Sequence, residues 1–201
     1  GLSQKKNTNV SESYLINDLE YSSNLNISKK GITSNFNLLY KNASKKGENS
    51  SNYNNDFESD NFLSAIFTSS LPMKKIHNNF QSNLAPKASL RLSPFDSENL
   101  SDLDRQLNMT NIFSTNRLGL SDSLEGGQSL TLGFDYDITD EQDNTFFSSS
   151  LGQIFRDIND NKLPSTSTMN NKSSDIIGQL EIKPNENFEI NYDFSADNDL
   201  N

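Results

Sequence analysis

Residues 129–139 read SLTLGFDYDIT, in which polar and apolar side chains alternate without interruption. Residues 188–197, FEINYDFSAD, repeat the pattern. The apolar positions of the two stretches are Leu130, Leu132, Phe134, Tyr136, Ile138, Phe188, Ile190, Tyr192, Phe194 and Ala196. Successive side chains of a strand point to opposite faces, so each stretch is predicted to be a β-strand with one apolar face. About 10 residues is also the length with which a tilted strand crosses a bilayer.

Other segments carry the same pattern less regularly, and the connections between them alternate in length. The eight predicted strands cover residues 13–27, 32–42, 61–71, 79–93, 129–139, 144–157, 174–183 and 188–197. Short turns are expected at residues 28–31, 72–75, 140–143 and 184–187, and long polar loops at residues 43–60, 94–127 and 158–173. Pro86 lies inside the fourth strand and is expected to require a sheet edge or a bulge, because proline cannot donate to the hydrogen-bond ladder.

Short turns on one rim and long loops on the other are typical of transmembrane β-barrels. We therefore predict an all-β fold, an antiparallel meander of about eight strands that is a fragment of a large transmembrane β-barrel. A soluble β-sandwich or solenoid is the alternative. Residues 1–10 lack the apolar segment of a signal peptide, and the chain ends after a strand without a terminal aromatic residue. Residues 1–201 are therefore expected to be an internal part of a barrel domain, without either barrel end.

The composition excludes several classes of protein. Only 32% of the residues are hydrophobic, which suits a barrel with one apolar face per strand, while the Asn- and Ser-rich loops are expected to be disordered. The formal net charge of −10 argues against nucleic acid as a partner. The absence of cysteine excludes disulfides and thiolate metal sites. No apolar run is long enough for a transmembrane helix.

The sequence shows no catalytic constellation, and we predict neither an enzyme nor a cofactor. His77 is the only histidine and is interpreted as an exposed rim residue, because no metal or acid–base partner lies at a known spacing. A divalent-cation site is conceivable among five clustered carboxylates, but a solvated lumen face and a charged rim are favoured. These carboxylates are Asp135, Asp137, Asp140, Glu141 and Asp143. Residues 148–150 are serines without a neighbouring base.

Three stretches together resemble a known family. They are NIFSTNRL at residues 111–118, followed by EGG at 125–127; SSLGQIF at 149–155; and SDIIGQL at 174–180, followed by KPNENF at 183–188. Their order is similar to that in the C-terminal barrel domain of the LptD family, the lipopolysaccharide-assembly proteins of the Gram-negative outer membrane. The residues that carry the resemblance are Asn111, Phe113, Arg117, Leu151, Gly152, Gln153, Asp175, Pro184, Asn185 and Phe188. The family's second arginine, after Arg117, is absent from this loop.

The resemblance implies a transporter located in the outer membrane of a Gram-negative bacterium, among outer-membrane lipids. Lipopolysaccharide would arrive from a periplasmic bridge protein of the LptA type and leave laterally into the outer leaflet. A lipoprotein of the LptE type would plug the lumen, and the family's periplasmic domain would lie outside these 201 residues. The residues expected to face the lumen are Asn83, Lys87, Arg91, Asp135, Asp137, Glu181, Glu189, Asn191 and Asp193. A porin-like channel, or a soluble β-rich surface module that binds a ligand, are the alternatives.

Overall fold

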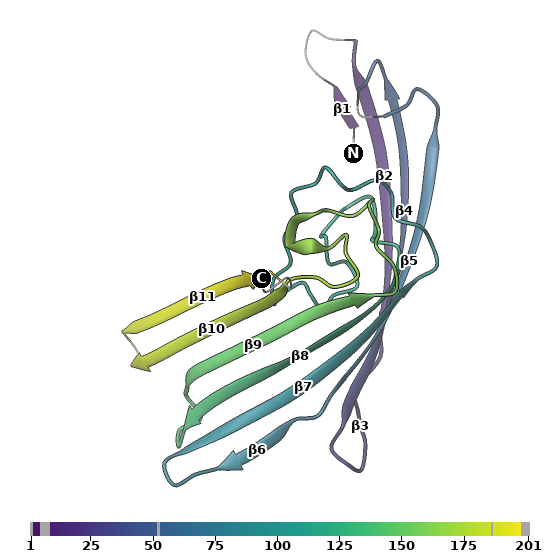
Figure 1. Ribbon diagram of the computed structural model, residues 1–201. Coiled ribbons are helices and arrows are strands. Elements are labelled where there is room, and N and C mark those ends of the chain that lie inside the picture. Colours follow the sequence, from purple (N-terminus) through teal and green to yellow (C-terminus); the bar gives the residue numbers. More distant parts are fainter. Residues whose placement is uncertain (1, 5–8, 52, 186, 198–201) are drawn as a thin grey trace.

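The computed structural model describes residues 2–4, 9–51, 53–185 and 187–197, and it shows one strongly curved antiparallel β-sheet (Figure 1). The strands are β1 (Leu2–Gln4), β2 (Ser11–Ser22), β3 (Asn26–Ile27), β4 (Thr33–Glu48), β5 (Glu58–Ser70), β6 (Met73–Ile76), β7 (Phe80–Ser93), β8 (Gly127–Asp140), β9 (Thr145–Arg156), β10 (Ile176–Asn185) and β11 (Phe188–Ala196). Neighbours follow chain order, β1-β2-β4-β5-β7-β8-β9-β10-β11. Strand β3 pairs with β4, and β6 pairs with β7. No helix in the described part of the chain is long and apolar enough to cross a membrane.

This topology confirms the predicted all-β antiparallel meander. The first predicted strand corresponds to β2 and β3 together, and the third to β5, while β6 falls on the predicted turn at residues 72–75. The remaining six predicted strands correspond to β4, β7, β8, β9, β10 and β11, while β1 is an additional strand. Long connections alternate with short ones along the chain, as predicted.

The polar loop predicted at residues 43–60 is wrong, because half of it is strand. Strand β4 continues to Glu48 and β5 already begins at Glu58, so only residues 49–57 connect them. Ser44 pairs with Ser59 within this extension. The side chains on both faces are largely polar there, so the apolar alternation stops although backbone pairing continues.

The turn predicted at residues 72–75 is also wrong. Ser70 pairs with Lys87 and Met73 with Leu84, which is one unbroken register across the Leu71–Pro72 step. The hairpin closes at residues 77–79, where the amide of His77 donates to the carbonyl oxygen of Phe80 at 2.8 Å. The strand is interrupted at Leu71 and Pro72, but the chain does not reverse there.

The expectation that Pro86 would lie at a sheet edge or in a bulge is wrong as well. Strand β7 is central, with β5 on one side and β8 on the other. The carbonyl oxygen of Pro86 accepts a hydrogen bond from the amide of Leu71 at 3.0 Å. The two prolines, Pro72 and Pro86, therefore lie in neighbouring rows of the same strand pair.

The two long loops at residues 94–126 and 157–175 are folded, so the expectation that they are disordered is wrong. They lie on the concave side of the sheet (Figure 1) and contain one 3-10 turn, η1 (Thr166–Thr168). Their apolar side chains form a core against Ile154 and Ile177 of the sheet. The loop members of this core are Leu100, Leu107, Ile112, Leu118, Leu120, Leu163 and Met169.

We call the face that these loops cover the inner face, and the opposite one the outer face. The outer face carries a band of exposed apolar side chains: Leu19, Tyr21, Phe36, Tyr40, Phe67, Leu90, Leu132, Phe155, Ile190 and Tyr192. A band of this size requires an apolar medium or a partner. The two faces also explain the irregular pattern of β5, since Phe62 and Ile66 point to the inner face and are buried there.

Candidate functional site

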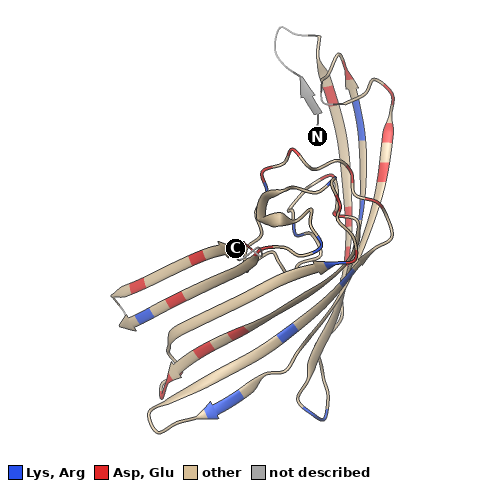
Figure 2. Cartoon of the chain, viewed as in Figure 1, with Lys and Arg blue, Asp and Glu red and all other residues tan. Residues whose placement is uncertain are grey.

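The inner face collects all nine residues that were expected to face a lumen, on strands β7, β8, β10 and β11. Lys87 forms an ion pair with Asp135, with 2.6 Å between Nζ and Oδ2. The amide nitrogen of Asn83 donates to Asp137 at 2.6 Å. Figure 2 shows acidic residues along β8, β10 and β11 toward the short turns. That this face lines a lumen stays a prediction.

On strands β10 and β11 the register brings the other predicted residues onto this face. Glu181 pairs with Asn191, and Asp193 lies two residues further along β11. Lys183 forms ion pairs with Glu181 and with Glu189, the latter at 3.3 Å. Because these side chains are 28–46% exposed to solvent, the pairs contribute little stability, and the face remains polar and net acidic.

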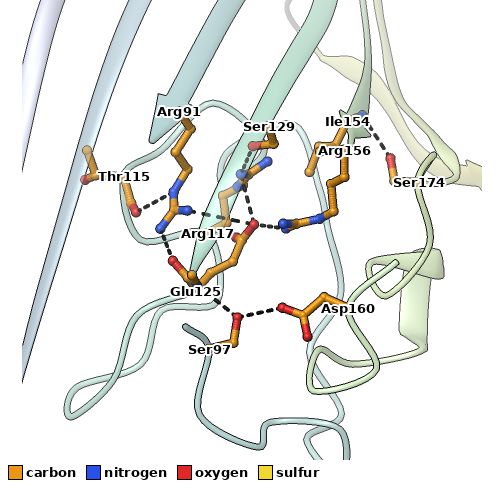
Figure 3. Close-up of polar contacts among 11 residues, drawn as sticks. Arg91, Ser97, Thr115, Arg117, Glu125, Ser129, Ile154, Arg156, Asp160 and Ser174 are labelled. Carbon is orange, nitrogen blue, oxygen red and sulfur yellow. Dashed lines mark hydrogen bonds and ion pairs between the residues drawn. The ribbon is translucent and has the colours of Figure 1, made fainter. Parts of the chain in front are cut away.

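Toward the long loops, the inner face contains a buried charge cluster (Figure 3). Arg91 of β7 and Arg156 of β9 flank β8, and their guanidinium groups meet Arg117 and Glu125 of the loop at residues 94–126. All four side chains are at most 4% exposed. Oε1 of Glu125 lies 3.0 Å from Nη2 of Arg117 and 3.9 Å from Nη1 of Arg91, and it also pairs with Arg156. One carboxylate thus neutralises part of the charge of three cations.

The same arginines hold the backbone of the loop. Nε of Arg91 donates to the carbonyl oxygen of Thr115 at 3.2 Å, and its Nη2 donates to that of Glu125 at 2.7 Å. Arg117 also donates to Oγ of Ser129 on β8. Burial lowers the pKa of Arg117 to about 9, so this side chain is still a cation at neutral pH. Removing the carboxylate would leave buried charges without a partner, which is expensive.

A second docking point consists of two glycines. Gly133 and Gly152 pair directly across β8 and β9, and Ile112 and Phe113 pack on the flat area that they leave. A Cβ on Gly152 would lie 3.1 Å from Cδ1 of Ile112, and one on Gly133 would lie 3.0 Å from Cζ of Phe113. Nζ of Lys87 lies 4.8 Å from the centre of the Phe113 ring. Side chains at either glycine would therefore push the loop away from the wall.

Polar contacts fix the ends of both loops. Oδ1 of Asn111 accepts from the amide of Asn108 at 2.9 Å, which closes the turn that presents Phe113. Asp175 accepts from Oγ1 of Thr168 at 2.7 Å and from Oγ of Ser195 on β11 at 2.8 Å. The second loop is thereby tied to the last strand of the sheet.

The loop at residues 94–126 also reaches β4 on the other side of the sheet. Nζ of Lys41 donates to the carbonyl oxygen of Ser121 at 2.8 Å, and Lys45 pairs with Asp122 at 3.3 Å. Leu124 packs with Leu39, Ala43 and Phe62 in a second small core. The loop is thus attached to the inner face from β4 to β10.

Most of the residues that carry the family resemblance hold the docked loops, and the others lie elsewhere on the wall. Five of them hold the docked loops: Asn111, Phe113, Arg117, Gly152 and Asp175. Nε2 of Gln153 donates to the carbonyl oxygen of Ser174 at 2.9 Å, so it also holds the second loop. Leu151 lies on the outer face beside Gly178. The others are at the opposite rim, in the β10–β11 turn: Pro184, Asn185 and Phe188.

Several residues of this site had no signal in the sequence. Arg156, Gly133 and Ser97 were not singled out, and the role of Glu125 was not foreseen. Oγ of Ser97 accepts from the amide of Gly126 at 3.0 Å and donates to Asp160 at 2.8 Å, which joins the two loops. The roles of these residues depend on which strand positions lie under a loop. The alternation of polar and apolar residues does not show which positions those are.

The remaining candidates for chemistry are isolated. His77 is half-buried in the short turn between β6 and β7, where its ring stacks on Phe80 at 4.2 Å between centroids. Asp140 accepts hydrogen bonds from the amides of Gln142 and Asn144 and so closes its own turn. Among the described residues, no three His, Cys, Asp or Glu side chains are grouped to hold a metal ion.

A curved antiparallel sheet with an apolar outer band, a charged inner face and long loops folded onto that face has the architecture of the wall of an outer-membrane β-barrel. The chain belongs to the LptD family, described as LPS transport system D, whose family model matches residues 41–201. The role of this family is the transport and assembly of lipopolysaccharide at the outer membrane of Gram-negative bacteria. A search of curated proteins finds no match to the chain.

Proposed function

We propose that this chain forms part of the barrel wall of a lipopolysaccharide translocon and acts without catalysis. The outer face contacts membrane lipid through its apolar band, and the inner face lines the lumen. Lipopolysaccharide is the cargo that this wall guides toward the outer leaflet. The family match supports the cargo, and the separation of apolar and charged faces supports the orientation.

The observation that carries the proposal is the way the long loops dock. The cluster of Glu125 with three arginines, and the packing of Phe113 over Gly133, hold the loop at residues 94–126 against the inner face. Docked in this way, the loops occupy part of the lumen at the long-loop rim. A narrowed lumen is what a channel that selects its cargo requires.

We infer from the same orientation of the wall where its protein partners bind. The inner face between the docked loops and the short turns is polar and acidic, with Asp137, Glu181 and Asp193 on three strands. We place a plug lipoprotein of the LptE type against this part of the wall. A bridge protein of the LptA type delivers cargo through the full-length protein.

The test uses cells depleted of their own translocon and supplied with the full-length gene that contains this segment. Asn191→Trp places a bulky ring on the inner face, and Ile190→Trp places one on the outer face one residue away. We expect the first to reduce delivery of lipopolysaccharide to the cell surface and the second to leave it unchanged. Heat-modifiable migration on a gel confirms that both variants fold.

A porin-like channel gives a different result. Neither the wild type nor the two variants would then restore delivery of lipopolysaccharide to the depleted cells, and Asn191→Trp would reduce only ion conductance in planar bilayers. That outcome would contradict the proposed function.

A further inference from the structure

Three strands, β2, β4 and β5, continue past the apolar band on the side of the long loops. The last continuous apolar row of the outer face is Leu19, Tyr40 and Leu63, which pair across the three strands. Beyond it the outer face of these strands is polar except at Leu15 of β2, which pairs with Ser44. We call these residues the outer polar patch: Asn17, Asn42, Ser44, Lys46, Ser59 and Asn61.

Hydrogen bonds between side chains hold the amides of this patch in place. Asn17, Asn42 and Asn61 form one row across the three strands. Nδ2 of Asn42 donates to Oδ1 of Asn61 at 3.1 Å, and the hydroxyl of Tyr40 donates to the same oxygen at 2.7 Å. Ser44 and Ser59 form the next row, with 3.2 Å between their hydroxyl oxygens. In the described chain, Nδ2 of Asn61 has no protein acceptor and is free to bind a ligand oxygen.

A shallow hollow of about 440 Å³ lies next to these rows. Its lining combines the apolar side chains of Leu15 and Phe57, which are 60% and 68% exposed, with Ser44 and Lys46. The ammonium group of Lys46 is 3.9 Å from Glu48, and both side chains are about half exposed or more, so this pair is weak. A flat apolar surface beside amides, hydroxyls and one cation suits a phosphorylated sugar, whose ring packs on Phe57 and whose phosphate pairs with Lys46.

The distance of the patch from the apolar band determines which kind of lipid headgroup can reach it. Lys46 lies six residues beyond Tyr40 on β4, which is roughly 20 Å along a strand. The headgroup region of an ordinary bilayer leaflet is only about 5–8 Å thick. A strand tilt of 35–45° shortens the height but leaves it well above that value. The patch therefore reaches into a layer deeper than phospholipid headgroups, as an oligosaccharide headgroup provides.

We propose that the outer polar patch and its hollow bind the phosphorylated sugar headgroup of lipopolysaccharide molecules that lie outside the barrel in the outer leaflet. This inference rests on the proposed orientation of the wall and adds a second contact for the same substance, on the exterior. The site holds the product of transport next to the barrel, separate from any contact inside the lumen.

The experiment measures binding of deacylated, phosphorylated core oligosaccharide to the full-length protein in detergent at fixed ionic strength. Combining Lys46→Glu with Phe57→Ala should raise the dissociation constant at least 10-fold. Lys75→Glu, an exposed lysine on β6 near the opposite rim, is the matched control and should leave it unchanged. Lys46→Gln should weaken binding of the phosphorylated sugar but not of its dephosphorylated form.

Equal affinity of the wild type and the double variant would overturn the inference. Equal affinity for the phosphorylated and the dephosphorylated sugar would overturn the role of Lys46. Delivery of lipopolysaccharide to the cell surface is measured in the same strains. If the variants deliver lipopolysaccharide normally and bind the sugar as tightly as the wild type does, the exterior site alone is refuted. A wild-type protein that delivers no lipopolysaccharide would refute the proposed function.

Discussion

At the scale of single residues, Glu125 is the residue on which the docking of the first long loop depends. Among the described residues it is the only carboxylate that forms ion pairs with Arg91, Arg117 and Arg156, and all four side chains are almost completely buried. A buried ion pair adds little net stability, but removal of one partner leaves an uncompensated charge. The cluster therefore fixes the position of the loop more than it stabilises the barrel.

Glu125→Gln should reduce the free energy of unfolding of the full-length protein by about 3 kcal/mol, because three buried cations lose their carboxylate. Arg117→Met should cost clearly less, since Glu125 keeps Arg91 and Arg156 as partners. Urea unfolding in detergent measures both, with Glu141→Gln in an exposed turn as the control. Equal losses for the two buried substitutions would contradict the role given to Glu125.

Gly152→Val should detach the loop locally, because the new side chain meets Ile112 at the wall. Overpacking of this kind costs about 1–3 kcal/mol. Trypsin cleavage after the exposed Arg105 should become faster, while the barrel still shows heat-modifiable migration. Ser149→Val, on the outer face of the same strand, should leave the cleavage rate unchanged. An unchanged rate in Gly152→Val would show that the loop does not rest on this glycine.

At the scale of the strand, alternation gave the positions of the strands but not all of their ends. Apolar residues mark a strand only where one face meets an apolar environment, so β4 was predicted to end at Asn42 and it continues to Glu48. Residues 72–75 were predicted to be a turn, yet the register passes through Pro72 unchanged. Strand ends therefore depend on pairing partners that a local pattern does not contain.

The register of β6 can be tested by a disulfide. Lys74 lies directly opposite Asn83 in a pair whose backbone groups do not bond to each other, which brings the Cβ atoms close. Lys74→Cys combined with Asn83→Cys should therefore form a disulfide under mild oxidation. Lys74→Cys with Gln81→Cys is the control, and faster bridging in the control would contradict the register.

The face of the sheet on which a side chain lies is the second property of a strand that can be tested. Leu132 lies in the apolar band of the outer face, whereas Gln179 lies on the inner face of β10. A lysine on the lipid side costs about 2–4 kcal/mol near the bilayer midplane, so Leu132→Lys should lower the folded fraction on a heat-modifiability gel. Gln179→Lys should fold normally. The reverse result would mean that the two faces have been exchanged.

At the scale of the whole molecule, the sequence predicted the meander and the family but not the folded loops. The loop cores are built from single apolar residues such as Leu107, Ile112 and Met169, scattered among Asn and Ser without a period. These loop residues are buried only because they pack against Ile154, Ile177 and two glycines of the curved sheet. Which inner-face positions receive a loop is a property of the assembled sheet.

The central claim is that one face of this sheet lines the lumen and the other faces lipid. The direct measurement is site-specific photocrosslinking in living cells, with a photoreactive amino acid placed in turn at residues 189–193 of the full-length protein. We predict that positions 189, 191 and 193 crosslink to lipopolysaccharide in transit or to the plug lipoprotein, and that positions 190 and 192 crosslink only to membrane lipid. Crosslinks to cargo or plug from positions 190 and 192, without the alternation, would contradict the account.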